Sequence, residues 1–583
     1  MPATASSVKR MTRTVITNAN LVDGTGVPAR AADVAFDNGV ITEVGAPGSI
    51  ATSGARVVDA DGRLVTPGWV DVHTHYDAQA TWDPWMTPSS WHGVTTVVMG
   101  NCGVGFAPAA PDRHDWLIAL MEGVEDIPGS ALTEGITWGW ESFEEYMDVL
   151  ESTPHVLDFG VQIPHGALRG YVMGDRGAAN EVATPDDIVA MSQMVESALR
   201  AGALGFSTSR TPLHRSKDGE LVPGTTAGED ELMGIADAIR RVGHGVFQFA
   251  PEHIKVPLNE WTWMRKVAQT TGATVSVNFS QPDDAPDLWR DVLTLLEEAQ
   301  ADGLPIVGQV AGRSIGVLMC LEGSAHPLLF HPAFNAVRFS SHEDQVAALR
   351  DPAFFRTVTE ELPDDGGLFE KVILGNTWKM FPVTDANIDY EPALDDSVRE
   401  IARRRGVTEM TVIVEQMMRD NGRGLIYMPF FNYAYGDLSF LYEAHTHPGT
   451  RMGLGDAGAH CGAICDGGMP TFMLTHWARD RRRGPRIPLE HIVHRQTQQT
   501  AELYGLRDRG VIAAGKRADL NIIDFENLTF TMPYMAYDLP AGGRRLVQMG
   551  RGYDATFTNG VQTVDHDEFT GELPGKLLRG PRN

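Results

Sequence analysis

The fold is decided by the stretch Pro67-Gly68-Trp69-Val70-Asp71-Val72-His73-Thr74-His75-Tyr76-Asp77. Residues 69–72 are apolar except for Asp71, which predicts a buried β-strand. Side chains two apart on a strand point the same way, so His73 and His75 would share one face at the strand's carboxyl end. Two imidazoles placed there can hold a divalent metal, although a lone His-x-His pair is more often a polar strand edge.

Seven further apolar segments alternate with helical patterns, which is typical of parallel strands joined by crossover helices. Together with residues 69–72 they give eight strands, the number that a closed (β/α)8 barrel needs. One connecting helix is predicted to begin after Thr184, which can cap it, and to end at Gly202. The seven segments cover residues 95–100, 156–163, 204–208, 245–249, 274–279, 305–310 and 452–455.

Short apolar runs separated by Asn-Gly, Asp-Gly and Pro-Gly turns predict antiparallel hairpins before residue 67. This series, ending in Pro-Gly-x-x-Asp-x-His-x-His, resembles the opening of the amidohydrolase superfamily, and residues 508–524 resemble the family's closing segment. The resemblance implies a TIM-like metal-dependent hydrolase barrel over 68–500, and a small composite β-sandwich from 1–67 and 501–583.

Residues 314–450 are too many for a βα loop, so we expect an insertion at about these positions. It contains two helical patterns, residues 396–405 and 408–420, and we expect it to cover the barrel mouth. Its aromatic residues are candidate pocket walls, although aromatics in such numbers are more often core: Trp378, Phe430, Phe431, Tyr433 and Tyr435.

Composition excludes several classes of partner. The 583 residues are 43% hydrophobic and carry a formal charge of −28, which argues against nucleic acid or an anionic membrane as partner. No apolar stretch approaches the ~20 residues of a membrane span. Residues 1–13 lack the apolar core of a signal peptide, and four cysteines are too few for a disulfide framework. We expect a cytoplasmic protein that acts on a small-molecule substrate. The sequence is compatible with either a monomer or a homo-oligomer.

Gly100-Asn101-Cys102-Gly103 ends the second predicted strand. On its own Cys102 would be a small buried hydrophobe. The motif resembles the N-acyl-D-amino-acid deacylase (D-aminoacylase) subgroup, in which a cysteine here is a metal ligand. The resemblance implies the ligand set His73, His75, Cys102 and Asp456, and a thiolate beside imidazoles favours zinc. It also makes Asp456 the catalytic proton carrier, the alternative being a helix cap or an ion pair.

The subgroup also has histidines after strands five and six. Here Ala250 and Asn278 occupy those places, and His253 could substitute only if its loop is shifted. We therefore expect one divalent metal per chain instead of two. Complete loss of the metal is the alternative.

Five residues are candidate substrate contacts. His165 and Arg169 resemble the subgroup's strand-three motif, while Arg210 and Arg313 follow strands four and seven. Either of these last two guanidiniums could grip a substrate carboxylate, although most arginines pair with surface acids. His460 is either a substrate contact or a structural histidine. The subgroup's carboxylate-binding lysine near strand six is missing, because Ser280-Gln281 stands there.

The leading functional hypothesis is a metal-dependent hydrolase of a non-peptide C–N bond, such as the amide of an N-acyl amino acid. Asp456 would act as general base and then general acid with a metal-activated water. A second hypothesis keeps the barrel and changes the substrate to a cyclic amide, an amidine or an ester. A third is a non-catalytic relative of the same fold.

Overall fold

The computed structural model describes residues 13–252, 260–361, 368–384 and 387–581. The predictions for His253 and for residues 1–12 fall outside these ranges. In the described ranges, no helix combines the length and the apolar character that crossing a membrane requires.

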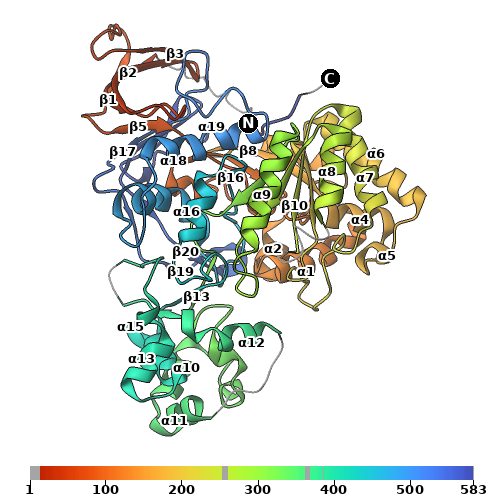
Figure 1. Cartoon of the computed structure of the whole chain (residues 1–583), viewed down its shortest axis with the longest axis vertical. Helices are drawn as coiled ribbons and strands as arrows, with labels where there is room; N and C mark the ends of the chain where they lie inside the picture. Colours follow the sequence, from red (N-terminus) through yellow and green to blue (C-terminus); the bar gives the residue numbers. More distant parts are fainter. Residues whose placement is uncertain (1–12, 253–259, 362–367, 385–386, 582–583) are drawn as a thin grey trace, which may run out of the picture.

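An eight-stranded parallel sheet forms the barrel of the molecule (Figure 1). Its strands are neighbours in the order in which they occur along the chain. All eight predicted strands are present, the last beginning at Thr450 instead of Met452. Their bounds are β6 Trp69–Asp71, β7 Val94–Met99, β8 Asp158–Pro164, β9 Gly205–Ser209, β10 Val246–Ala250, β11 Thr274–Asn278, β12 Ile306–Val310 and β16 Thr450–Met452.

The first and last strands close the sheet through residues just beyond their ends. Thr74 and Ala457 form a parallel bridge. The backbone N–H of His75 donates to the carbonyl of Ala457 at 2.8 Å, and that of Asp456 donates to the carbonyl of His73 at 3.1 Å. These bonds complete the (β/α)8 barrel, as predicted.

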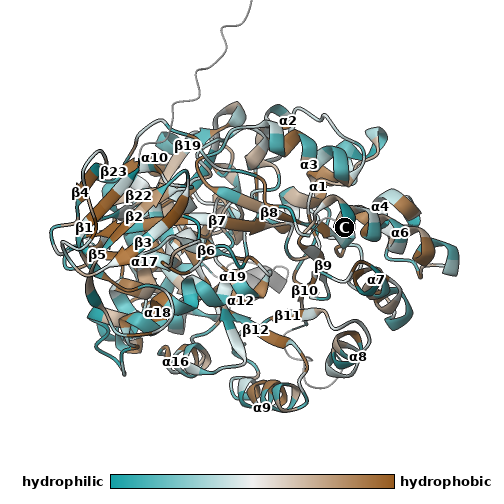
Figure 2. Cartoon of the chain, turned by 90° about the horizontal axis from the view of Figure 1, so that it is seen from above, coloured by the Kyte–Doolittle hydropathy of each residue, from teal (hydrophilic) through white to brown (hydrophobic). Residues whose placement is uncertain are grey.

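Helices surround the barrel, and Figure 2 shows α6, α7, α8 and α9 standing outside the strands. The predicted helix is α6, which Thr184 and Asp187 begin with a capping box and Gly202 ends at a φ of 116°. The helix bounds are α1 His114–Val124, α2 Gly129–Gly135, α3 Phe143–Ser152, α4 His165–Met173, α5 Asp175–Ala178, α6 Pro185–Ala201, α7 Glu229–Val242, α8 Trp261–Thr271, α9 Leu288–Ala301, α16 Ser439–Thr446, α17 Met469–Phe472, α18 Leu489–Gln496 and α19 Gln498–Leu503.

Both chain ends contribute to one nine-stranded sheet. N-terminal β5 pairs antiparallel with C-terminal β17. The sheet folds back on itself, because the rings of Phe36 in β2 and Phe557 in β22 lie 5.4 Å apart although three strands separate them. The composite sandwich is confirmed. Its strands are β1 Thr14–Leu21, β2 Arg30–Asp37, β3 Val40–Gly45, β4 Arg56–Asp59, β5 Leu64–Pro67, β17 Leu520–Ile523, β22 Tyr553–Thr558, β23 Val561–Asp565 and β24 Glu568–Phe569.

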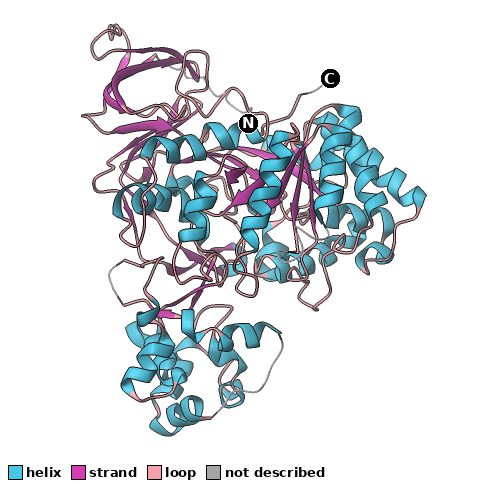
Figure 3. Cartoon of the chain, in the orientation of Figure 1, coloured by secondary structure: helices cyan, strands magenta, loops and turns pink. Residues whose placement is uncertain are grey.

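Between β12 and α16 the chain builds a mostly helical lobe beside the barrel (Figure 3). Buried side chains from Val317 to Met428 give the lobe its own apolar core. The predicted helices at 396–405 and 408–420 are α13 and α14. The elements are β13 Gly316–Met319, α10 His342–Arg350, α11 Pro352–Glu360, α12 Leu368–Gly375, β14 Phe381–Pro382, α13 Val398–Arg405, α14 Glu409–Met417, α15 Arg419–Gly422 and β15 Ile426–Pro429. The domain bounds drawn from the sequence stay a prediction.

Two small two-stranded sheets lie between β17 and β22 along the chain. Strand β18 pairs with β21, and β19 pairs with β20. Their bounds are β18 Thr529–Phe530, β19 Tyr534–Leu539, β20 Gly543–Val547 and β21 Gly550–Arg551.

Candidate active site

Four donor atoms converge just beyond the ends of β6, β7 and β16. The Nε2 of His73 lies 3.2 Å from the Sγ of Cys102 and 3.2 Å from the Oδ1 of Asp456. The Nε2 of His75 lies 3.5 Å from the same oxygen of Asp456. One ligand atom each from His73, His75 and Cys102 lies within 4.8 Å of the other two, and all three residues are buried. The structure thus brings together the four residues singled out in the sequence.

The spacing of these donors suits one tetrahedral ion. Nitrogen, oxygen and sulfur ligands lie ~2.0–2.3 Å from zinc, so any two of them are roughly 3.3–3.8 Å apart in a tetrahedron. Three of the six separations, His73 to Cys102, His73 to Asp456 and His75 to Asp456, are 3.2, 3.2 and 3.5 Å and are close to that range. Burying so many polar groups is costly unless they have a common partner. The residues present therefore fit a metal.

Electrostatics within the cluster favour the metal-binding forms of Cys102 and Asp456, whereas the histidines would release a proton when an ion binds. Burial would lower the pKa of His73, but the neighbouring Cys102 and Asp456 outweigh it and raise the pKa to about 9. Burial would raise the pKa of the Cys102 thiol and of the Asp456 carboxyl, but the two imidazoles lower both below their ordinary values. Thiolate and carboxylate are the ligating forms, and a bound cation would take over the role of the imidazole charge.

The Gly-Asn-Cys-Gly turn positions Cys102 because its glycines let the backbone approach two neighbouring strands. A Cβ on Gly100 would lie 2.3 Å from the carbonyl oxygen of Gln162 in β8, and one on Gly103 would lie 2.8 Å from the backbone of Thr208 in β9. Both glycines have positive φ, as does Cys102 at 55°. A bulkier turn could not hold the thiol against the two histidines.

Buried amides orient the donors. The Nδ1 of His73 lies 2.7 Å from the Oε1 of Gln309, and the Nε2 of Gln309 donates to the Oγ of Ser276 at 2.8 Å. An Nδ1–H bonded to Gln309 leaves the lone pair of Nε2 free for a metal. Cys102 is fixed from β10, because its backbone N–H donates to the Oε1 of Gln248 at 3.0 Å.

A cavity of about 450 Å³ opens onto the donors, and His75, Cys102 and Asp456 are part of its wall. The lobe contributes to the lining with Phe430 and Phe431, two of the five aromatic residues proposed as walls. Tyr433 is instead buried, and its hydroxyl donates to the carbonyl of Pro392. This volume is enough for a small-molecule ligand.

Glu125 directly follows α1 and lies beside the donor cluster. Its Oε1 lies 3.4 Å from the Nδ1 of His75, and its Oε2 lies 3.6 Å from the Nε2 of His460. The side chain is 2% exposed. Glu125 therefore lies where it can orient His75 from the side opposite to Asp456.

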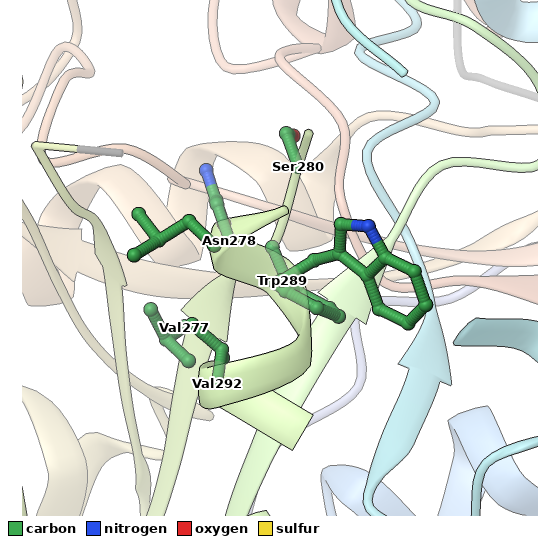
Figure 4. A pocket seen from close by; sticks show the side chains of 7 residues that line it. Val277, Asn278, Ser280, Trp289 and Val292 are labelled. Atoms are coloured by element: carbon green, nitrogen blue, oxygen red, sulfur yellow. The ribbon is translucent and has the colours of Figure 1, made fainter. Parts of the chain in front are cut away.

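Ala250 and Asn278 both line the cavity, at the carboxyl ends of β10 and β11. The Nδ2 of Asn278 lies 3.6 Å from the Sγ of Cys102, and its Oδ1 accepts from Gln248 at 2.9 Å. Figure 4 shows the amide nitrogen of Asn278 pointing away from Val277 and Val292, which lie with it around a hollow of about 10 Å³. Both positions face the donors, but neither carries an imidazole.

His165 and Arg169 belong to a buried cluster around Glu231. The Nε2 of His165 lies 2.9 Å from the Oε1 of Glu231, and its Nδ1 lies 2.8 Å from the Oγ1 of Thr208. Arg169 forms an ion pair with the same Glu231 oxygen. Burial lowers the pKa of His165 although Glu231 opposes the shift. Neither residue is among the described residues that line the cavity, and a substrate contact by them stays a prediction.

Arg210 and Arg313 are also paired within the protein. Arg210 donates to Glu260 at 2.9 Å, and Arg313 donates to Asp466 at 2.9 Å. Among the described lining residues only His460 represents the five predicted substrate contacts. The roles of Arg210, Arg313 and His460 toward a substrate stay predictions.

Gln309, Gln248 and Glu125 were missed in the sequence. A signal existed for the two glutamines, since each is a lone amide in an otherwise apolar run, Ile306–Val310 or Val246–Ala250. Such a polar residue in a fully buried strand must find a partner inside the barrel. Glu125 has no comparable signal, because it follows a helix and looks like any surface acid.

Over most of its length the chain is similar to D-aminoacylases and to a related deacylase. The chain is 25% identical over 578 residues to the D-aminoacylase of Alcaligenes xylosoxydans xylosoxydans, and the match covers 97% of each chain. A solved D-aminoacylase with a binuclear metal centre has a TM-score of 0.63 at 22% identity, covering 97% of this chain and 99% of that one. The N-acyl-D-glutamate deacylase of Bordetella bronchiseptica, solved with zinc and a phosphonate inhibitor, also has a TM-score of 0.63, at 20% identity, covering 98% of this chain and 100% of that one.

A family profile covers most of the sequence. The profile of the amidohydrolase family matches residues 56–564, which includes the barrel, the lobe and much of the composite sheet. The resemblance to D-aminoacylases read from the motifs is confirmed. The chain belongs to the amidohydrolase family, whose enzymes act on carbon–nitrogen bonds other than peptide bonds.

Proposed function

We propose that the protein hydrolyses the amide C–N bond of a small molecule with one divalent metal, zinc being the best match. His73, His75, Cys102 and Asp456 would hold the ion. The observation that carries the proposal is the convergence of the buried His73, His75 and Cys102 with the largely buried Asp456, three of which, His75, Cys102 and Asp456, line a 450 Å³ cavity. A protein that kept the fold for assembly alone would gain nothing from so costly an arrangement.

The donor set supports one zinc ion over two. Thiolate with imidazoles and a carboxylate suits zinc better than magnesium or calcium. A second ion would need further ligands, and Ala250 and Asn278 supply no imidazole. The solved D-aminoacylase has a binuclear centre described as activated by one metal and attenuated by the second, and the solved N-acyl-D-glutamate deacylase contains zinc.

Asp456 is the proposed general base and acid. A bound metal would polarise the substrate carbonyl and lower the pKa of water beside it. Asp456 borders the cavity and is ionised in the cluster, so it can take the proton of the attacking water and then give it to the leaving amine nitrogen. In the structure the Nε2 atoms of both His73 and His75 lie within 3.5 Å of the Asp456 Oδ1, so the carboxylate is beside the imidazoles that would hold the ion.

Two measurements test this function. Elemental analysis after metal-replete purification should find one zinc per chain, and a screen of N-acyl amino acids of both hands and of neutral amides should find a substrate. Asp456→Asn should then fold but lose at least ~100-fold in kcat, because the amide cannot carry the proton. Near wild-type turnover by Asp456→Asn would exclude Asp456 as the proton carrier. If elemental analysis found no bound metal after purification in metal-replete buffer, the whole proposal would be excluded.

A further inference from the structure

Much of the cavity wall is apolar. Side chains of the barrel loops and of the lobe contribute, among them Val124, Leu213, Ile315, Phe430 and Ile464. A cavity of about 450 Å³ with such a wall can bury the apolar part of a small ligand. The affinity of such a ligand comes from the area that it removes from water.

Apart from histidines, the charged residues of the wall are acidic. Glu125, Asp126 and Asp456 line the cavity, and neither lysine nor arginine is found among the described residues that do so. When a divalent ion is bound, the Cys102 thiolate and the Asp456 carboxylate balance its two charges. Glu125 and Asp126 are then two further acidic groups of the wall that the ion and its ligands do not balance.

Three cations close to the wall are already paired with carboxylates, and a fourth, Arg544, acts on the Asp126 carboxyl of the wall. Lys379 donates to the carbonyl of the lining residue Phe430 at 3.1 Å, but it is paired with Asp283. Arg210 and Arg313 are paired with Glu260 and Asp466. To grip a ligand carboxylate, any of these three paired cations would have to abandon a buried or partly buried partner, which is costly.

The wall offers neutral hydrogen bonds instead. Ser280 lines the cavity and is 6% exposed, and its Oγ has no hydrogen-bond partner among the residues that the structure describes. A buried hydroxyl without a partner is unfavourable, so a ligand carbonyl or amide that bonds to it gains affinity. A serine there suits a neutral polar group better than a charged one.

We propose that the substrate is an amide without a free carboxylate: a neutral, largely apolar group occupies the cavity beside the scissile bond. The proposal rests on the proposed function and narrows its substrate class. A carboxylate placed in the cavity would be desolvated, would find no cation among the described lining residues and would face Glu125 and Asp126. Free N-acyl amino acids are therefore disfavoured relative to their neutral amides.

A matched pair of ligands tests the proposal by binding, independently of turnover. We would titrate zinc-loaded protein with a phenylalkyl hydroxamate and with the same compound bearing a ring carboxylate, at about pH 8, where carboxyl groups are ionised. The neutral hydroxamate should bind at least ~10-fold more tightly, the lower range for one desolvated and unpaired charge. Equal or tighter binding of the acid would overturn the proposal, and so would failure of both compounds to bind.

Substitutions in the wall provide the matched controls. Asp126→Asn keeps an oxygen acceptor for the Ser324 hydroxyl and the Gly462 N–H but removes the charge. It should therefore reduce the ratio of the affinities for the neutral and the carboxylate-bearing hydroxamate. Ser280→Lys adds a cation to the wall and should reverse the preference, whereas Ser280→Ala should keep it. A preference unchanged by both Asp126→Asn and Ser280→Lys, in variants with wild-type thermal stability, would show that wall charge does not select the ligand. Hydrolysis of any amide in the screen tests the function itself, so the two failures are distinguishable.

Discussion

Replacing Gln309 with leucine should weaken metal binding without touching a ligand. Gln309 accepts the Nδ1–H of His73 at 2.7 Å and is itself held by Ser276 at 2.8 Å, so it fixes both the ring and its tautomer. Gln309→Leu leaves a buried N–H without an acceptor, which costs about 1–3 kcal/mol. Because this N–H belongs to a ligand, the loss should appear as a roughly 10- to 100-fold weaker zinc affinity.

Competition with a chromophoric chelator measures that affinity, and circular dichroism checks the fold. Gln309→Glu is the matched control, because a carboxylate still accepts from His73 and should keep zinc affinity at or above the wild-type level. Ser276→Ala, which removes only the support of Gln309, should have a smaller effect. If a folded Gln309→Leu variant bound zinc as tightly as the wild type, the orientation of His73 by Gln309 would be refuted.

Three further predictions concern the metal and pH. In cobalt-substituted protein a thiolate-to-metal charge-transfer band should be present and should disappear in Cys102→Ser; a band that survives would exclude Cys102 as ligand. Zinc-loaded protein, with free zinc at a hundred times its Kd, should have a free energy of unfolding about 3 kcal/mol higher than protein from which a chelator has removed the zinc. A melting temperature that the chelator does not change would contradict this prediction. Burial lowers the pKa of His92 from 6.5 to about 4, so its contribution to stability is complete above pH 6.5 and is lost as the pH falls toward 4. That loss is about 3 kcal/mol, and melts of His92→Gln, which has no such group, should show a smaller decrease over the same pH range.

The barrel could be predicted because its elements carry local signals. Each strand is a short apolar run, and α6 has its own cap, stripe and glycine stop. His73 and His75 could be found because strand geometry alone puts them on one face. Cys102 and Asp456 needed the resemblance, since a cysteine in a turn and an aspartate after a strand have many ordinary explanations.

The substrate contacts could not be judged from sequence because their partners lie far away along the chain. Arg313 pairs with Asp466, which is 153 residues away, and Arg169 pairs with Glu231, which is 62 residues away. An arginine after a barrel strand looks the same whether it faces a ligand or a distant acid. Only the folded chain shows that each of these guanidiniums already forms an ion pair with a buried carboxylate.

Three of the four proposed metal donors lie on the two segments that close the barrel. Two backbone hydrogen bonds join the segments that follow β6 and β16. One runs from the N–H of His75 to the carbonyl of Ala457, and the other from the N–H of Asp456 to the carbonyl of His73. Across this seam the Nε2 atoms of His73 and His75 lie 3.2 and 3.5 Å from the Oδ1 of Asp456. Correct register of the last strand on the first is therefore a condition for the donor cluster, since a slip of one residue would turn Asp456 to the other face. In return, an ion bound to donors from both strands would cross-link the seam and stabilise the closed barrel over any form open at this edge. Closure of the fold and assembly of the site are thus one event in this chain.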